Sequence, residues 1–260
     1  MRSTPSPAAY FGGRVGRYDA AYDAPGSDGH ALRSRLGAVL RLAGDGPGEA
    51  LDAGMGPGRL AAELARRGWS VSGVDASAEM VAAARARLPE AAARLHAAPI
   101  EALPFADRAF DLVTATGVLE YARLDAALRE LVRVLRPGGR LVVSYPSPSA
   151  PYGIWKSRAW YPAVRAAKRA LRRADSEMPR GAGAVDPESF AERLAGLGLE
   201  VTAREPVAAL LVPAPLDEVL PRLSTALAER LERRTRVGRR LATQLVFAAE
   251  RGRDGGSVSL

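Results

Sequence analysis

Glycines at three alternate positions follow an acid in the segment Leu51-Asp52-Ala53-Gly54-Met55-Gly56-Pro57-Gly58. Glycine lets the chain turn sharply and lets a ligand approach the backbone, because it has no Cβ atom. A helix that begins near Arg59 would point its free N–H groups and the positive end of its dipole at this turn. The segment therefore predicts a binding loop for a nucleotide that carries an anionic or carboxylate group.

The spacing of these glycines separates two classes of nucleotide. Dinucleotides with a pyrophosphate are bound by G-x-G-x-x-G, whereas this loop has Asp52 followed by glycines at 54, 56 and 58. A carboxylate beside the turn suits a ligand with ammonium and sulfonium charges better than a pyrophosphate. The loop therefore argues against a nicotinamide oxidoreductase.

A second acid, Asp75, ends the next predicted strand. An acid about 20 residues beyond the glycine loop is placed to accept hydrogen bonds from ribose hydroxyls. Its other role would be to cap the helix that runs through Met80 to Leu88. Ser77 is the better cap, so Asp75 is predicted to bind the ribose.

Two further segments complete a pattern. One is Phe110–Tyr121, preceded by Glu101–Phe105, and the other is Leu135–Leu141, which predicts a helix end with a glycine stop before a strand. The order and spacing of all four segments resemble class I S-adenosylmethionine-dependent methyltransferases. The branch in question includes ubiquinone and menaquinone biosynthesis enzymes and many natural-product methyltransferases, and the resemblance covers about residues 45–146.

The resemblance implies S-adenosylmethionine as the cofactor. Pro99 departs from the family, because most relatives carry there an acid that meets the adenine amino group; adenine is therefore expected to contact backbone near Ile100. Tyr18 and Tyr22, four residues apart, share a helix face in a segment that resembles a flexible cofactor lid. The expected cofactor-binding residues are Tyr18, Tyr22, Asp52, Ala53, Gly54, Met55, Gly56, Gly58, Asp75, Ala76, Met80, Pro99, Ile100, Glu101, Thr116 and Leu119.

The resemblance also implies methyl transfer by SN2 displacement, in which the protein chiefly aligns the acceptor and excludes water. Many relatives have Glu-His where this chain has Glu120-Tyr121, so a histidine base is missing there. Glu120, Tyr121 and Tyr145 are the candidate catalytic residues, as proton acceptors or acceptor-positioning groups. His30 is expected at the surface.

The elements around these segments predict an α/β fold. Strands are expected near 49–53, 70–75, 94–98, 111–116, 140–145, 199–204 and 243–249, with helices between them. They would form a Rossmann-like seven-stranded, mostly parallel sheet with helices on both faces and the last strand antiparallel. A helical lid over residues 1–40 would precede a methyltransferase domain over 41–260, with helical insertions at about 147–185 and 213–240.

The insertions are expected to shape the acceptor site. The helix Trp155–Ala174 carries an apolar stripe opposite several arginines, which suits a lid helix and also peripheral contact with an anionic membrane. The stripe within 213–240 could cover the substrate or form a dimer seam. We expect a small, apolar acceptor of lipid, quinone or natural-product type, and a monomer or homodimer.

The amino-acid composition narrows the classes of protein to which the chain can belong. The chain has no cysteine and two histidines, so disulfides and a metal site are not expected. It has no apolar run near the ~18 residues that span a bilayer, which favours a cytoplasmic protein. A formal charge of +8 comes without a nucleic-acid-binding motif. An RNA methyltransferase, and a methyltransferase-fold scaffold without catalysis, stay open as alternatives.

Overall fold

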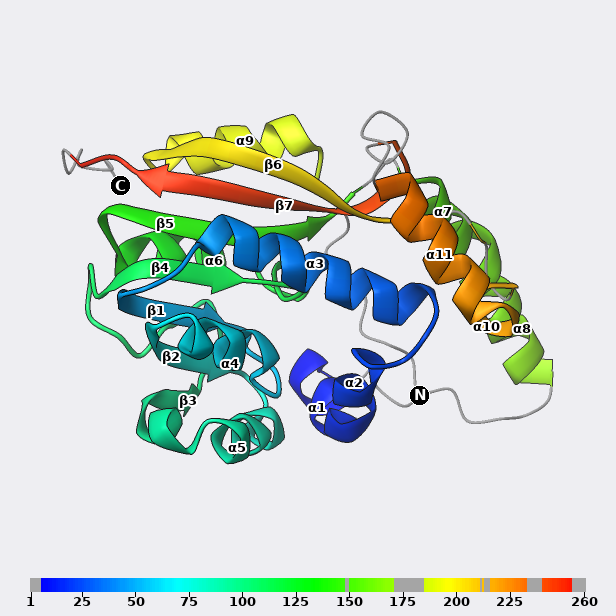
Figure 1. The fold of residues 1–260 in the computed structure, drawn as a ribbon, viewed down its shortest axis with the longest axis horizontal. Coiled ribbons are helices and arrows are strands. Elements are labelled where there is room, and N and C mark those ends of the chain that lie inside the picture. The colour runs from blue at the N-terminus through cyan, green and yellow to red at the C-terminus, as the bar shows by residue number, and fades with distance from the viewer. Residues whose placement is uncertain are drawn as a thin grey trace.

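The computed structural model describes residues 6–147, 150–170, 185–210, 212, 216–232 and 240–253. Its centre is one seven-stranded sheet in the order β3-β2-β1-β4-β5-β7-β6 (Figure 1). Strands β1 to β5 run parallel, and β7 is antiparallel to both of its neighbours. The predicted Rossmann-like sheet is confirmed. The strands are β1 (Gly48–Ala53), β2 (Trp69–Asp75), β3 (Leu95–Ala97), β4 (Phe110–Ala115), β5 (Leu135–Pro146), β6 (Leu199–Ala209) and β7 (Ala242–Arg251).

Helices cover both faces of the sheet (Figure 1). On one face, α3 (Ser27–Ala43) and α4 (Arg59–Arg66) bury apolar side chains against the sheet. On the other face, α6 (Leu124–Val134) and α9 (Pro187–Gly196) do the same. Helix α5 (Ala78–Arg87) packs on β2 and β3, as does the short 3-10 segment η1 (Pro89–Arg94) that follows it. Ser77 caps α5 as predicted, since its hydroxyl accepts from the Met80 amide.

The segment before β5 differs from its prediction. Helix α6 ends at Val134 and β5 begins at the next residue, so no glycine stop separates them. Leu135 pairs with Phe110, whereas Leu112 pairs with Arg140, and the register therefore shifts in between. Gly138 has φ +76° at this shift. The glycines thus make a bulge inside a longer strand, where a helix terminus was expected.

The described parts of the two predicted insertions are largely helical. After β5 come α7 (Pro151–Trp155), the π-helical turn η3 (Lys156–Trp160) and α8 (Tyr161–Ala170). The helical segment therefore begins earlier than the predicted helix Trp155–Ala174. Residues 171–174 of that prediction lie outside the described residues. Between β6 and β7 come α10 (Leu216–Val219) and α11 (Pro221–Glu232). None of the helices in the described ranges is long and apolar enough to cross a bilayer.

The N-terminal segment forms α1 (Pro7–Gly12), α2 (Val15–Ala21) and the start of α3. Figure 1 shows α1 and α2 at the end of the sheet toward which the parallel strands point. Residue 40, the predicted end of the lid, lies inside α3, where Val39 and Leu40 are buried against the sheet. The division into a lid and a domain stays a prediction.

Candidate functional site

The glycine loop after β1 has the backbone that its sequence predicts. Gly54, Gly56 and Gly58 have φ of +76°, +54° and +79°, in the region where a Cβ atom is costly. The amides of Gly54 and Met55 both donate to the carbonyl of Val74, at 2.8 and 2.9 Å. The loop is therefore fastened to the end of β2, and its two other N–H groups are also bound, since Gly56 donates to Asp75 and Gly58 to the Met55 carbonyl.

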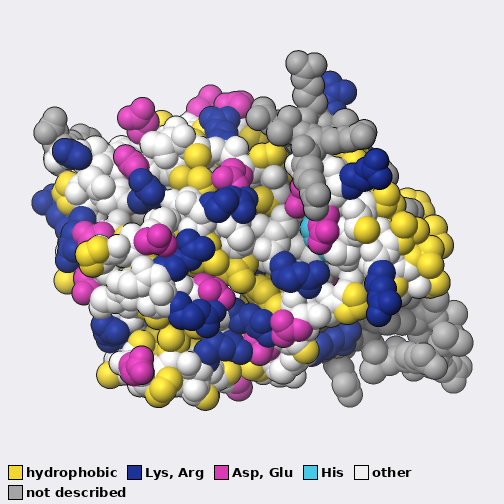
Figure 2. Space-filling view, viewed as in Figure 1, with side chains coloured by type: hydrophobic (Ala, Val, Ile, Leu, Met, Phe, Trp, Pro, Cys, Tyr) yellow, Lys and Arg dark blue, Asp and Glu magenta, His cyan; other side chains and the backbone are white. Residues whose placement is uncertain are grey.

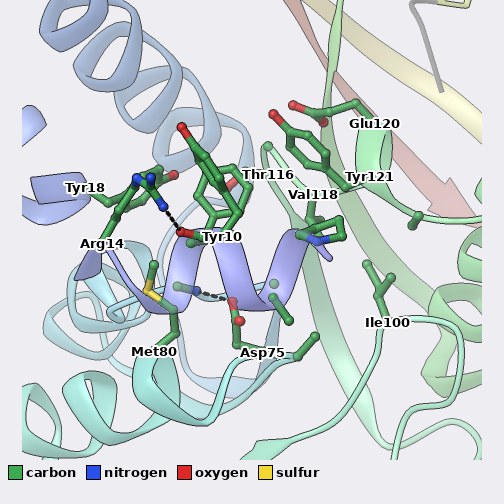
Figure 3. A pocket seen from close by; sticks show the side chains of 18 of the residues that line it. Tyr10, Arg14, Tyr18, Asp75, Met80, Ile100, Thr116, Val118, Glu120 and Tyr121 are labelled. Atoms are coloured by element: carbon green, nitrogen blue, oxygen red, sulfur yellow. Dashed lines mark hydrogen bonds between the residues drawn. The ribbon is translucent and has the colours of Figure 1, made fainter. Parts of the chain in front are cut away.

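Asp75 lies at the end of β2 beside this loop. One carboxylate oxygen accepts from the Gly56 amide and the other from the Ser77 amide, each at 2.9 Å. Burial raises the pKa of Asp75, and these two backbone hydrogen bonds oppose the rise. Each oxygen keeps a free lone pair, so the carboxylate can shape the loop and still accept from a ligand (Figure 3).

A cavity of about 710 Å³ lies between the glycine loop and helices α1 to α3 (Figure 3). This is within the usual range for small-molecule sites, roughly 300–1,000 Å³. It is built from chain segments far apart in sequence, at the carboxyl ends of β1, β2 and β4. The predicted site residues that line it are Tyr18, Gly54, Gly56, Asp75, Ala76, Met80, Pro99, Ile100, Glu101, Thr116, Glu120 and Tyr121.

Other predicted residues are placed elsewhere. Tyr22, Asp52 and Met55 line a smaller pocket of about 20 Å³ beside the main cavity. Ala53 and Leu119 are fully buried core residues, and Gly58 packs against Ala84. None of these three lines either of the two cavities described here.

Tyr145, one of the candidate catalytic residues, is also placed away from the cavity. Its side chain is buried in the core on the α6–α9 face, with its ring 5.3 Å from that of Phe190. Burial raises the pKa of its phenol, and the negative charge of Glu120 adds to the rise. The strand neighbour Ser144 points to the other face, where its hydroxyl accepts from the Gly117 amide at 3.0 Å.

Asp52 is a buried acid with an incomplete set of partners. It is 1% exposed. One oxygen accepts from the Thr114 hydroxyl at 2.9 Å, and the other has no hydrogen-bond partner among the described residues. Burial raises the pKa of Asp52 to about 7; the Thr114 hydrogen bond opposes this, while the charge of Asp75 adds to it. A buried acceptor without a donor is costly, so this oxygen is free for a positively charged or N–H-bearing ligand group.

Glu120 and Tyr121 come from η2 (Leu119–Tyr121), the turn after β4. Figure 3 shows the Glu120 carboxylate beside the Tyr121 ring at one wall of the cavity, across from Tyr10 and Tyr18. Burial raises the pKa of Glu120, and Arg35 opposes the rise. Burial and the neighbouring Glu120 raise the pKa of Tyr121 to about 12. Tyr121 is therefore a neutral hydrogen-bonding group near pH 7.

Ion pairs hold α2 against the helices that follow the glycine loop and β2. Arg59, the first residue of α4, donates to Asp19 at 2.6 Å and to Asp23 at 2.5 Å. Arg87 of α5 donates to the other oxygen of Asp19 at 2.7 Å. Tyr18, the neighbour of Asp19, lines the cavity. These ion pairs therefore hold α2, which forms part of the cavity wall, against α4 and α5.

Several residues of the cavity were not predicted. Many of them lie on the N-terminal helices and one on β7; among them are Tyr10, Phe11, Arg14, Arg17, Asp28, Leu32, Arg35 and Gln244. A signal existed for Arg35, because it shares a helix face with the apolar Leu32, Ala38 and Val39 at spacings of three and four residues.

His30 differs from its prediction as a surface residue. It is 5% exposed, and its Nε2 lies 3.1 Å from a carboxylate oxygen of Glu232 in α11. The same oxygen accepts from the Ser34 hydroxyl at 2.9 Å. His30 therefore joins α3 to the second insertion and does not line the main cavity.

Comparison with known proteins matches the segment that carries the motifs. Residues 51–143 match the family model described as a methyltransferase domain. Over 116 residues, 43% of this chain and 45% of the relative, the chain is 40% identical to malonyl-[acyl-carrier protein] O-methyltransferase of Pseudescherichia vulneris. Over 109 residues, 41% of this chain and 45% of the relative, it is 43% identical to demethylmenaquinone methyltransferase of Beutenbergia cavernae. The chain spans about half the length of the curated relatives it matches.

Similarity of fold extends over nearly the whole chain. The solved magnesium protoporphyrin IX methyltransferase of Synechocystis, with bound S-adenosylhomocysteine, superposes with a TM-score of 0.57 at 17% identity, over 94% of this chain and 97% of that one. At such identity the likeness concerns the fold, which agrees with the strand order and the glycine loop described above. Residues 51–143 therefore match a methyltransferase domain, and the chain has a fold similar to that of this solved methyltransferase.

Proposed function

We propose that this protein transfers the methyl group of S-adenosylmethionine to a small acceptor. The observation that carries the proposal is the loop of Gly54 and Gly56 bound to Asp75 at the wall of a 710 Å³ cavity. The methyltransferase domain over residues 51–143 and the named relatives support the same activity.

The residues present fit this cofactor. Asp75 retains acceptor capacity for the ribose hydroxyls. The unpartnered oxygen of Asp52 suits the ammonium group of the methionine part, because a buried carboxylate is stabilised by a positive donor. The segment from Ala98 to Glu101 lines the cavity and would hold adenine. Pro99 offers it an apolar contact in place of a carboxylate.

When bound, S-adenosylmethionine supplies an activated methyl group, and the chain positions the acceptor against it. Phe11 and Tyr121, whose ring centroids are 5.4 Å apart, close one side of the cavity and exclude water. Glu120 can accept a proton from the acceptor, and burial matches its pKa to that task by raising it. Tyr121 can orient the acceptor by a hydrogen bond.

The walls near Glu120 suit an acceptor with an apolar body. Tyr10, Phe11, Leu32 and Val118 line the cavity as well. The relatives named above act, by their names, on malonyl-[acyl-carrier protein] and on demethylmenaquinone. We therefore favour a small molecule of lipid, quinone or natural-product type over RNA.

The two insertions carry an exposed apolar surface. Figure 2 shows apolar side chains gathered at the right edge of the molecule, over the region of α10 and α11. The large hydrophobic residues exposed within the described ranges all belong to the insertions, and they are Ile154, Trp155, Tyr161, Leu216, Val219, Leu220 and Leu223. This surface supports peripheral contact with an anionic membrane. The alternative is that it forms the interface of a homodimer. A cytoplasmic location stays a prediction.

Calorimetric titration with S-adenosylmethionine and S-adenosylhomocysteine tests the proposed function. We expect micromolar binding of both to the wild-type chain, and at least tenfold weaker binding to Asp75→Ala. Asp107→Ala is the matched control, because Asp107 is 72% exposed and lies outside the cavity. A folded wild-type chain that binds neither compound would contradict the proposal and support the scaffold alternative.

A further inference from the structure

Arg35 is a buried cation at the wall of the cavity. It lies on the face of α3 that also contributes Asp28 and Leu32, and it is 6% exposed. Its Nη1 donates to the side-chain oxygen of Gln244 at 3.3 Å, which is a long hydrogen bond. It packs so close to the backbone that a Cβ on Gly117 would lie 2.7 Å from the same nitrogen. The guanidinium is therefore fixed in position.

The charge of Arg35 is not matched by a close acid. Among the residues that the structure describes, no carboxylate oxygen lies within 4.0 Å of its nitrogens. Its other neighbours are the phenols of Tyr18 and Tyr22, and the more distant carboxylate of Glu120. Glu120 itself has a buried oxygen without a hydrogen-bond partner in the described chain.

A buried arginine normally has a carboxylate partner, since an unpaired charge in a protein interior is costly. Arginine has five N–H donors in a planar fork; the long bond to Gln244 uses one of them, and the phenols of Tyr18 and Tyr22 also interact with the guanidinium. The cavity supplies the space for an anion at the remaining donors. Planar, two-point recognition of carboxylates and phosphates is the task that suits arginine best.

We propose that Arg35, assisted by Gln244, is the subsite for an anionic oxygen group, a carboxylate or phosphate, on the methyl acceptor. This inference rests on the proposed function for the identity of the ligand as an acceptor. The acceptor is then amphipathic: its apolar body contacts Phe11 and Leu32, and its acidic group reaches Arg35. Arg14 and Arg17, which also line the cavity, add positive charge along the entry path.

The test compares acids with neutral molecules of the same shape. Phenylacetate is titrated against phenylacetamide, and hexanoate against hexanamide, with and without saturating S-adenosylhomocysteine. Benzylphosphonate is the phosphate-like arm. We expect the wild-type chain to bind at least one acid ten times more tightly than its amide. A benzylphosphonate affinity above that of phenylacetate would assign the subsite to phosphate rather than carboxylate.

Variants then assign the preference to Arg35. Arg35→Gln should reduce the acid preference to less than twofold and change S-adenosylhomocysteine affinity less than threefold. Arg41→Gln is the matched control, because Arg41 lies on the same helix, is 63% exposed and pairs with Glu205 at 2.8 Å. It should keep the full acid preference. Gln244→Leu should weaken acid binding severalfold, and it provides a second variant where Arg35→Gln does not fold.

Two results would overturn the inference. One is equal affinity of acids and amides for the wild-type chain in both pairs. The other is an acid preference that stays at its full size in folded Arg35→Gln or, where that variant is unfolded, in Gln244→Leu. An acid preference in a chain that binds no S-adenosylhomocysteine would instead contradict the proposed function and leave the anion subsite standing.

Discussion

The ion pairs on Asp19 predict a measurable contribution of α2 to ligand affinity. Arg59 and Arg87 donate to its two oxygens at 2.6 and 2.7 Å. Helix α2 also supplies Arg17, Tyr18 and Ala21 to the cavity wall. Asp19→Asn keeps the size of the side chain and removes its charge, so it weakens the attachment of this wall without changing the ligand contacts.

The magnitude follows from the exposure of the pair. Asp19 is 26% and Arg59 25% exposed, between the exposed pairs that contribute roughly 0.2–1 kcal/mol and the buried charged hydrogen bonds that contribute roughly 1.5–3 kcal/mol. For two such contacts we expect a loss of about 1–2 kcal/mol. If ligand binding requires α2 in place, the dissociation constant rises by roughly 5- to 30-fold.

The dissociation constant for S-adenosylhomocysteine and the hydrogen exchange of α2 amides are the two readouts. Asp45→Asn is the matched control, because Asp45 is 76% exposed and makes one long contact of 3.4 Å to Arg67. Burial raises the pKa of Asp19, but the hydrogen bonds from Arg59 and Arg87 outweigh it and lower the pKa. The attachment is therefore present at neutral pH and is lost as the pH falls through this lowered pKa. Unchanged affinity together with unchanged exchange in Asp19→Asn would refute the reasoning.

Three further predictions follow from single positions. Burial raises the pKa of Asp52 to about 7 in the native state, so the free energy of unfolding of the ligand-free protein falls as the pH rises from about 4 to about 7. In Asp52→Asn, the melting temperature should lose this pH dependence. An unaltered pH dependence would contradict the assignment. Gly54→Ala places a Cβ 2.7 Å from the Val118 side chain and should abolish cofactor binding. In Gly56→Ala the nearest contact of the new Cβ is the Tyr18 ring at 3.8 Å, so this variant costs only the strain of positive φ, about 1–2 kcal/mol. Calorimetry of both variants checks this order. Leu220→Asp, at a position 48% exposed, should lower co-sedimentation with anionic vesicles without changing the melting temperature, and equal sedimentation of both proteins would exclude membrane contact through this surface.

The sheet could be predicted from the sequence because its strands are short apolar runs between strong turn signals. The boundaries of β1, β2 and β4 follow directly from such runs. The start of β5 could not be predicted in this way. Arg136-Pro137-Gly138-Gly139 has the composition of a helix end, and only the pairing of Leu135 with Phe110 makes it a bulge within a strand. Local composition does not encode that long-range register.

The site shows the same limit at the level of single side chains. Tyr145 was a natural candidate because it ends a central strand, but neighbouring strand residues point to opposite faces. Ser144 points toward Gly117 at the site, and Tyr145 points into the core beside Phe190. Whether a strand residue lies near the ligand therefore depends on which face of the sheet its side chain points to, and the face alternates from one residue to the next. By contrast, Asp75, Gly54 and Gly56 carry their geometry in residue type and spacing, and all three line the cavity, whereas Gly58 packs against Ala84.

The boundary of the family match has a physical counterpart in the cavity. Residues 51–143 contain the glycine loop, Asp75 and Glu120, which serve the proposed cofactor and the transfer step. Arg35 and Gln244 lie outside that segment and line the same cavity, with Arg35 packed against Gly117. A shared cofactor requires a shared loop, whereas each acceptor requires its own contacts. On the proposed function, Arg35 and Gln244 contribute to acceptor choice, and substitutions at these two positions should change that choice while leaving the binding of S-adenosylhomocysteine in place.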